Sequence, residues 1–164
     1  MRDRASTDFL SIKRAKNGQG VFANNVFKKG ETVLEFRGKI FTKNNLPNPY
    51  DAVEDHYVQI EKDEYMGPSG GVDDFVNHSC EPSCGVKIYN PGIFLVAIGD
   101  IGVGEEITWD YSTTMDEDEW EMDCCCGSKL CRKKIRDYKY LPNDIQEKYQ
   151  KLAIAPAYIL RTKK

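Results

Sequence analysis

Three short stretches hold most of the side chains that could do chemistry in this chain of 164 residues. The first, residues 73–80, ends in Asn77-His78-Ser79-Cys80 and offers a small polar cluster. The second, residues 107–111, ends in Tyr111, and the third, residues 123–131, holds four of the six cysteines. We expect one site built from all three, in which a metal ion ties the end of the chain to its middle.

The cysteines have the spacing of a metal site. Cys124, Cys126 and Cys131 follow the pattern C-x-C-x₄-C and would supply three thiolates, while Cys125 would point away from its neighbours. Disulfides are rare in reducing compartments, and adjacent cysteines pair poorly on geometric grounds. We therefore expect zinc rather than free or redox-active thiols. A structural zinc needs a fourth ligand, and a distant one would attach the C-terminal segment to the domain; the candidates are Cys80, Cys84, Cys125 or a histidine.

Composition limits the class of protein. Hydrophobic residues make up 40% of the chain and charged residues 30%, which is typical of one folded domain of this length. No apolar run approaches the ~20 residues of a membrane span, and the N-terminus lacks the apolar core of a secretory signal. We therefore expect an intracellular protein with no membrane partner. The net charge of −3 argues against direct binding of nucleic acid.

Charge is concentrated near the third stretch. Six carboxylates lie between residues 116 and 123, and Arg132-Lys133-Lys134-Ile135-Arg136 follows shortly afterwards. An acidic stretch beside a site attracts a basic ligand. A charge run of this kind is also typical of a solvated loop, and both interpretations stay open.

The rest of the chain predicts a mostly β domain that positions these stretches. Strands are expected at residues 8–16, 21–23, 32–41, 56–60 and 106–111, with a hairpin over 88–98 that turns at 90–92. Turns are expected at 17–20 and 28–31, and a surface loop at 42–55. Gly38 would mark a bulge or a close approach of two backbone segments.

Only the C-terminus has a helical pattern. Pro142-Asn143-Asp144 can begin a helix, and Ile145, Tyr149 and Leu152 share one face at positions i, i+4 and i+7. This helix is expected to end near Ala155-Pro156.

Four segments of the chain resemble the motifs of one family, the SET-domain protein-lysine methyltransferases. The resemblance to the central motif lies in Asn77-His78-Ser79-Cys80-Glu81-Pro82, and that to the first motif in Gly18-Gln19-Gly20-Val21-Phe22-Ala23. Residues 104–111 resemble the last strand and its catalytic tyrosine, and the C-x-C-x₄-C pattern resembles the post-SET zinc motif. The four occur in the family's order and cover about residues 8–136.

The resemblance implies a fold. It is the β-clip-like SET fold, with small curved sheets around a threaded pseudoknot segment, a zinc-bound post-SET tail and a short C-terminal helix. The SET domain would span residues 8–112, the post-SET zinc segment 120–136 and the C-terminal helical tail 137–164. Residues 77–80 would be the threaded segment, an exception to the rule against threading. The resemblance also implies Cys80 as the fourth zinc ligand.

An activity is implied as well, the transfer of methyl groups from S-adenosylmethionine to lysine in a protein. The catalytic residue would be Tyr111, and the substrate channel would include Phe36 and Trp109. The substrate would be a lysine-rich tail, histones being the family's usual substrates, and a eukaryotic member would be nuclear. The cofactor would be held largely by backbone at Asn17, Gly18, Gln19, Gly20, Asn77 and His78. Tyr57 would border the same pocket, and Ile135 would cover the adenine.

Three positions depart from the family pattern. Asp74 stands where many members carry arginine, and Phe36 stands where many have a second active-site tyrosine. Trp109 occupies a position that is usually phenylalanine or tyrosine and that helps to set the number of methyl groups added. These departures keep an alternative open, a catalytically silent SET-like module that contains zinc and binds a peptide. The catalytic tyrosine and the intact central motif favour the enzyme.

Overall fold

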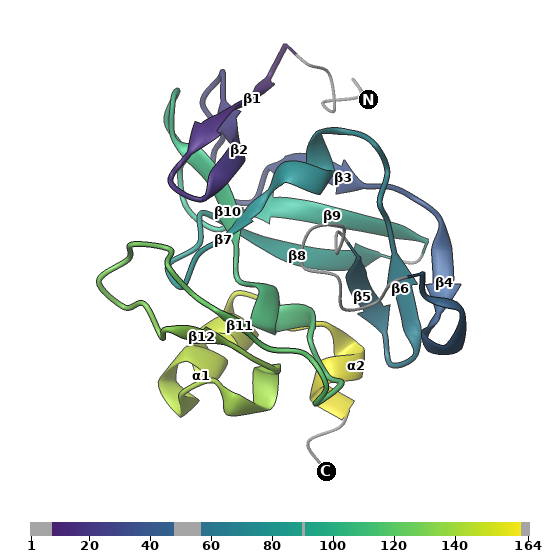
Figure 1. Ribbon diagram of the computed structural model, residues 1–164. Coiled ribbons are helices and arrows are strands. Elements are labelled where there is room, and N and C mark those ends of the chain that lie inside the picture. Colours follow the sequence, from purple (N-terminus) through teal and green to yellow (C-terminus); the bar gives the residue numbers. More distant parts are fainter. Residues whose placement is uncertain (1–7, 48–56, 90, 162–164) are drawn as a thin grey trace.

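The computed structural model describes residues 8–47, 57–89 and 91–161, and this part of the chain is mostly β, as the sequence predicts. Figure 1 shows the hairpin of β1 (Leu10–Ala15) and β2 (Gly18–Ala23) at one end of the molecule. Helices α1 (Asn143–Lys151) and α2 (Ala157–Arg161) lie at the other end. The strands of the described residues form four small sheets between these ends.

One sheet brings the sequence motifs together. Its order is β1-β2-β10-β7, where β10 is Glu106–Trp109 and β7 is the two-residue strand Asn77–His78. β10 runs antiparallel to β2 and parallel to β7. Segments that are far apart in sequence therefore lie on adjacent strands, and the residue after β10 leads directly into Tyr111.

The other sheets complete the described domain. Two of them have the orders β3-β9-β8 and β4-β6-β5, and the third is the short ribbon β11-β12. Their bounds are β3 Thr32–Phe36, β4 Ile40–Thr42, β5 Val58–Glu61, β6 Glu64–Met66, β8 Cys84–Tyr89, β9 Gly92–Ala97, β11 Met122–Asp123 and β12 Lys134–Ile135. Short 3₁₀ helices join them: η1 Lys43–Asn45, η2 Val72–Phe75, η3 Tyr111–Thr114 and η4 Tyr138–Tyr140.

A single apolar cluster fills the space between the larger sheets. It takes buried residues from eight of the described strands, and among them are Val21, Leu34, Leu95 and Ile107. Burial of large apolar side chains is the main favourable term in folding, so these contacts hold the motif strands in place.

The strand expected over 32–41 is interrupted. β3 ends at Phe36 and β4 begins at Ile40. Between them Gly38 adopts φ +132°, and a Cβ there would lie 2.6 Å from the Cα of Gly67. The close approach that Gly38 predicts is therefore confirmed, and it explains why the strand breaks.

Two motif boundaries also differ from the predictions. Residues 18–20 belong to β2, so the turn expected over 17–20 contracts to Lys16 and Asn17. The strand expected to reach residue 111 ends at Trp109 because the Asp110 carboxylate accepts a hydrogen bond from the Ser112 amide and caps η3. His56 of the strand expected over 56–60, Asn90 of the expected turn and residues 48–55 of the expected loop lie outside the described residues.

The C-terminal tail forms two helices rather than the one expected. Ala153 adopts φ +54°, and α1 ends at Lys151 rather than near Ala155. The tail packs through its own apolar cluster: Tyr138, Leu141, Tyr149, Ile154, Tyr158 and Ile159. The Tyr158 hydroxyl donates to the carbonyl of Gln59 in β5 at 2.9 Å, which joins this cluster to the sheets. Among the described helices, none has the length and apolar character needed to span a bilayer.

Gly85 lets the C-terminal cluster reach β8. A Cβ at this position would lie 2.2 Å from Cγ2 of the buried Ile154. We predict that Gly85→Ala lowers the free energy of unfolding by about 1–3 kcal/mol through overpacking. Gly99→Ala is the control, because its Cβ would meet nothing within 4 Å. Equal unfolding curves for the two variants would contradict this packing role.

Candidate functional site

Four cysteine sulfurs lie together where the sequence predicts a metal. The Sγ atoms of Cys80, Cys124, Cys126 and Cys131 all lie within 4.8 Å of one another. Cys124 Sγ is 3.8 Å from that of Cys80 and 3.7 Å from that of Cys131. A regular tetrahedron with zinc–sulfur bonds of about 2.3 Å has edges of about 3.8 Å, so the cluster fits a tetrahedral ion. Cys125 is exposed and lies outside the cluster, and Cys84 is buried in the main core.

The sulfur of Cys80 receives two N–H groups. The Arg132 amide lies 3.4 Å from it and Nε2 of His78 lies 3.3 Å from it. The amide of Tyr111 donates to Nδ1 of His78 at 3.1 Å, so the proton of a neutral ring belongs on Nε2, facing the sulfur. Burial lowers the pKa of His78 to about 4, although the nearby Asp110 charge acts in the opposite direction. The ring is therefore neutral. Two such donors suit a thiolate, and His78 links the cysteine cluster to Tyr111.

Asp110 joins several segments, and the sequence reading missed it. Its side chain is fully buried, and Oδ1 accepts from the Arg132 guanidinium at 2.8 Å and from the Ser112 amide at 3.1 Å. Oδ2 accepts from the Tyr149 hydroxyl at 2.8 Å. The sequence marks Asp110 only by its place next to Tyr111 in the last motif, and this place does not show which residues its carboxylate contacts. Arg132 looked like part of a solvated basic run.

Charge and burial shift the pKa values of both side-chain partners. Burial alone would lower the pKa of Arg132, but its hydrogen bond to Asp110 and the carboxylate charge raise the pKa above its ordinary value. Burial, followed by the same charge, raises the pKa of Tyr149 above its ordinary value. Both groups therefore remain protonated and keep donating to Asp110.

Aromatic rings form a continuous wall beside Tyr111. The Tyr111 ring centroid lies 4.8 Å from that of Trp109 and 5.3 Å from that of His78. Phe36 packs edge-on against Trp109 at 5.8 Å. The Tyr111 hydroxyl donates to the Val76 carbonyl at 2.8 Å, so both the ring and its oxygen are held in place. The structure thus brings the predicted catalytic and channel residues together.

The first motif meets the central motif and the cysteine segment. Nδ2 of Asn77 donates to the Gln19 carbonyl and to Oε1 of Glu106, both at 2.9 Å. A Cβ on Gly20 would lie 2.5 Å from that Glu106 oxygen, so only glycine leaves room for this contact. Nδ2 of Asn17 donates to the Cys125 carbonyl at 3.2 Å.

The remaining predicted residues divide into two cases. Ile135 is buried in a cluster with Cys80 and Cys124, close to the predicted site. Tyr57 packs edge-on against Phe41 of β4, with ring centroids 5.8 Å apart, and is not brought to the motifs by this contact. The departure at Asp74 has a local explanation, because its carboxylate accepts hydrogen bonds from the backbone amides of residues 69 and 70.

A family model described as the SET domain matches residues 18–112. The chain belongs to the SET-domain family. It is 33% identical over 141 residues, 74% of its length, to a variant-silencing SET domain-containing protein of Plasmodium falciparum. It is 35% identical over 107 residues, 62% of its length, to a histone-lysine N-methyltransferase of Kluyveromyces lactis described as H3 lysine-4 specific.

These relatives are much longer than this SET-domain chain, which covers 5% of the Plasmodium protein and 10% of the Kluyveromyces protein. Solved structures share the fold. A crystal structure of KRYPTONITE in complex with mCHH DNA, an H3(1–15) peptide and SAH matches with a TM-score of 0.61 and 23% identity. The match covers 77% of this chain and 29% of KRYPTONITE.

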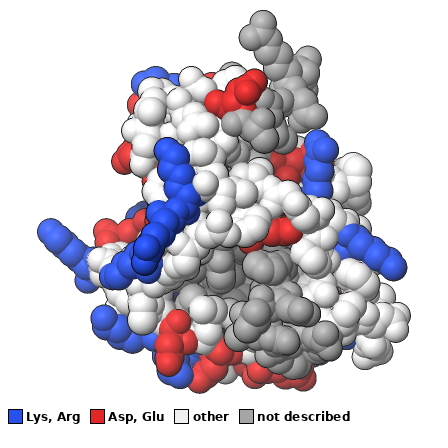
Figure 2. All heavy atoms as spheres, turned by 45° about the horizontal axis from the view of Figure 1, so that its top comes forward, with Lys and Arg blue, Asp and Glu red and all other residues white. Residues whose placement is uncertain are grey.

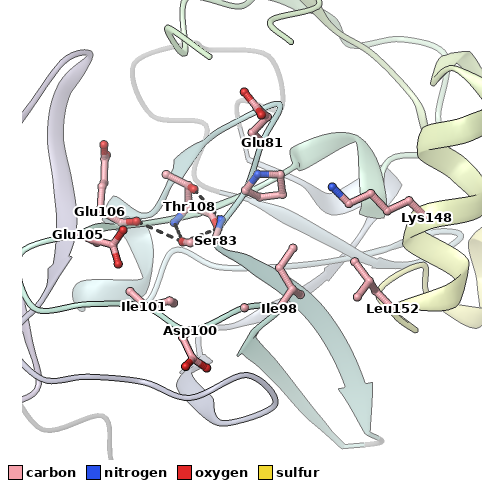
Figure 3. Close-up of a pocket in the computed structure, with 12 residues that line it drawn as sticks. Glu81, Ser83, Ile98, Asp100, Ile101, Glu105, Glu106, Thr108, Lys148 and Leu152 are labelled. Atoms are coloured by element: carbon pink, nitrogen blue, oxygen red, sulfur yellow. Dashed lines mark hydrogen bonds between the residues drawn. The ribbon is translucent and has the colours of Figure 1, made fainter. Parts of the chain in front are cut away.

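A cavity of about 630 Å³ adjoins the Asn77–Glu106 contact of the SET domain. Figure 3 shows Lys148 of α1 and Leu152, the residue that follows α1, reaching into it opposite Glu105 and Glu106. Its four carboxylates each accept a hydrogen bond from elsewhere in the chain, so they are already partly compensated. They belong to Glu81, Asp100, Glu105 and Glu106.

The acidic stretch of the SET-domain chain is largely paired with its own side chains. Five of the six carboxylates between residues 116 and 123 contact a cation or a hydroxyl within the chain; they are Glu117, Asp118, Glu119, Glu121 and Asp123. Figure 2 shows positive and negative side chains interspersed over one face of the molecule. This pairing leaves less free negative charge for docking a basic ligand than the sequence implies.

Asn77 offers a test of the contact between the motifs. We predict that Asn77→Asp lowers the free energy of unfolding by about 1–3 kcal/mol, because two donors are lost and a carboxylate then faces Glu106. Glu106→Gln in the same chain supplies a donor to the new carboxylate and should restore part of this loss. The measurement is chemical denaturation of the single and double variants. A double variant less stable than Asn77→Asp would contradict the contact.

Proposed function

We propose that this chain is a protein-lysine N-methyltransferase that uses S-adenosylmethionine. The observation that carries the proposal is the placement of Tyr111. It lies within one network of contacts with the central motif, the aromatic wall and the cysteine cluster. Membership of the SET-domain family and relatives named as histone-lysine N-methyltransferases support the same activity.

Cofactor binding would fall to the first and central motifs. S-adenosylmethionine supplies a methyl group that its sulfonium already activates. Backbone at residues 17–20 would hold it together with Asn77 and His78, and Ile135 would cover the adenine. The hydrogen bond from Asn77 to the Gln19 carbonyl supports this assignment, since it places the first and central motifs side by side.

The aromatic wall would receive the substrate lysine. A lysine amine attacks only when it is neutral, and burial against Phe36, Trp109 and Tyr111 disfavours its charged form. The wall would also hold the amine in line with the methyl group, which is a positioning task. The Tyr111 oxygen is fixed by its bond to the Val76 carbonyl and could accept a hydrogen bond from the amine. Contacts from the polarised methyl group to this oxygen would be a smaller contribution.

We also propose that the four clustered cysteines bind a structural zinc ion. The sulfur spacing and the two N–H groups directed at Cys80 support this assignment. The ion would fasten the segment at 120–136 to the central motif. It would therefore contribute to the folding of that segment rather than to the chemical step.

A lysine-rich protein tail is the proposed substrate, with a histone as the first candidate. The Kluyveromyces relative is described as H3 lysine-4 specific, and the KRYPTONITE structure contains an H3 peptide. Activity on histones would place the protein in a nucleus. The KRYPTONITE complex also contains DNA, whereas for this chain the absence of direct nucleic-acid binding stays a prediction from its net charge.

The zinc proposal predicts different behaviour for two neighbouring cysteines. Cys126→Ser should lower zinc affinity by more than about 100-fold, because a ligand is removed. Cys125→Ser should keep one zinc per chain, since this side chain is exposed and outside the cluster. Metal analysis of the purified variants measures both. Equal zinc contents in the two variants would contradict the ligand set.

Methyl transfer tests the activity itself. The protein is incubated with labelled S-adenosylmethionine and, in separate assays, with a panel of core histones or with whole-cell lysate. Tyr111→Phe should lose about 100-fold or more of the rate while still binding the cofactor. Tyr89→Phe, an exposed tyrosine on β8, is the control and should keep the full rate.

The distribution of label separates the alternatives. Label on a histone supports the histone substrate, and label only in lysate supports the chemistry on another protein. No label with intact cofactor binding would favour the catalytically silent zinc-containing peptide-binding module. A normal rate in Tyr111→Phe would remove Tyr111 from the mechanism.

A further inference from the structure

Tyr149 of α1 reaches from the C-terminal tail to the residue before Tyr111. It is 1% exposed, and its hydroxyl donates to Oδ2 of Asp110 at 2.8 Å. The other carboxylate oxygen is occupied by Arg132 and by the Ser112 amide. The two oxygens of Asp110 are therefore shared among three segments: η3, the residue after Cys131, and α1.

The orientation of Asp110 sets the start of η3. Its side chain caps this 3₁₀ helix, and its carbonyl accepts both the amide and the hydroxyl of Thr113, at 3.0 and 2.7 Å. Tyr111 is the first residue of η3, so its backbone direction follows from how Asp110 sits. A buried carboxylate that loses one donor turns toward another, because an unsatisfied charged oxygen away from water is unfavourable.

We propose that Tyr149 is a positioning residue for Tyr111, acting through Asp110. This inference rests on the proposed methyltransferase function. The Tyr149 hydroxyl holds Oδ2, which leaves Oδ1 in place for Arg132 and Ser112. The ring of Tyr111 then keeps its packing against Trp109 and its bond to Val76. The C-terminal tail that follows the cysteine segment would thus help to position the active-site tyrosine.

The anchoring of α1 does not depend on the Tyr149 hydroxyl. Tyr138 and Tyr158 fasten the same cluster through hydroxyls bonded to the carbonyls of Gln146 and Gln59. Lys148 of α1 and Leu152, the residue that follows α1, line the cavity (Figure 3). Removing one hydroxyl from Tyr149 should therefore leave the helix seated and change what Asp110 can bond.

Two tyrosine-to-phenylalanine variants form a matched pair. Tyr149→Phe removes the bond to Asp110, and Tyr138→Phe removes a comparable buried hydroxyl bond that ends within the tail. Tyr149→Phe should lower kcat by about 10-fold, as expected for a misplaced reacting group, with the KM of both substrates changed by less than about twofold. Tyr138→Phe should lower thermal stability about as much as Tyr149→Phe does. It should leave kcat within about twofold of the value for the unchanged chain.

Amide hydrogen exchange of the segment 110–114 gives a readout that needs no activity. Exchange there should rise in Tyr149→Phe and stay unchanged in Tyr138→Phe. Equal kcat and equal exchange in the two variants would overturn the proposal and reduce Tyr149 to a packing residue. If the unchanged chain transfers no methyl groups, the proposed function fails. The exchange result then still decides whether Tyr149 positions the Tyr111 segment.

Discussion

A carboxylate that water does not reach must be compensated by groups inside the protein, and Asp110 is such a carboxylate. Burial of an unpaired charge is strongly unfavourable, so its partners have to be in place for the fold to be stable. They come from η3, from the residue after Cys131 and from α1. One electrostatic requirement thereby draws together the last SET motif, the cysteine segment and the C-terminal tail.

The cysteine cluster and the proposed catalytic tyrosine are joined by two separate bridges. His78 accepts from the Tyr111 amide and directs its other nitrogen at Cys80. Arg132 bonds Asp110 through its side chain and Cys80 through its amide. A displacement at the sulfur cluster would therefore reach Tyr111 by both routes. His78 and Arg132 thus contact both the cysteine cluster and the segment that begins at Asp110.

Local patterns in the sequence were enough for the mostly β fold and for three of the clustered cysteines, Cys124, Cys126 and Cys131. The family and the fourth cysteine, Cys80, came from the resemblance of the motifs, since spacing left several candidates open. Contacts between residues that are far apart in the sequence could not be predicted in this way. The helical period identified the buried face that holds Tyr149, but not that its hydroxyl meets Asp110. The charge run at 116–123 showed its sign, but not its pairing within the chain. The contact between Gly85 and Ile154 could not be predicted, since a glycine within a strand does not indicate which side chain packs against it.

The sulfur cluster has a consequence for how the protein is made. Cys80 and Cys124 are 44 positions apart. During synthesis at about 5–20 residues per second, the first thiol waits about 2–9 s for the second to emerge. Tyr149 follows later still, so the Tyr111 segment has no complete set of partners until almost the whole described chain has left the ribosome. A nascent chain that stops before Tyr149 therefore has its motif strands but lacks one of the partners of Asp110.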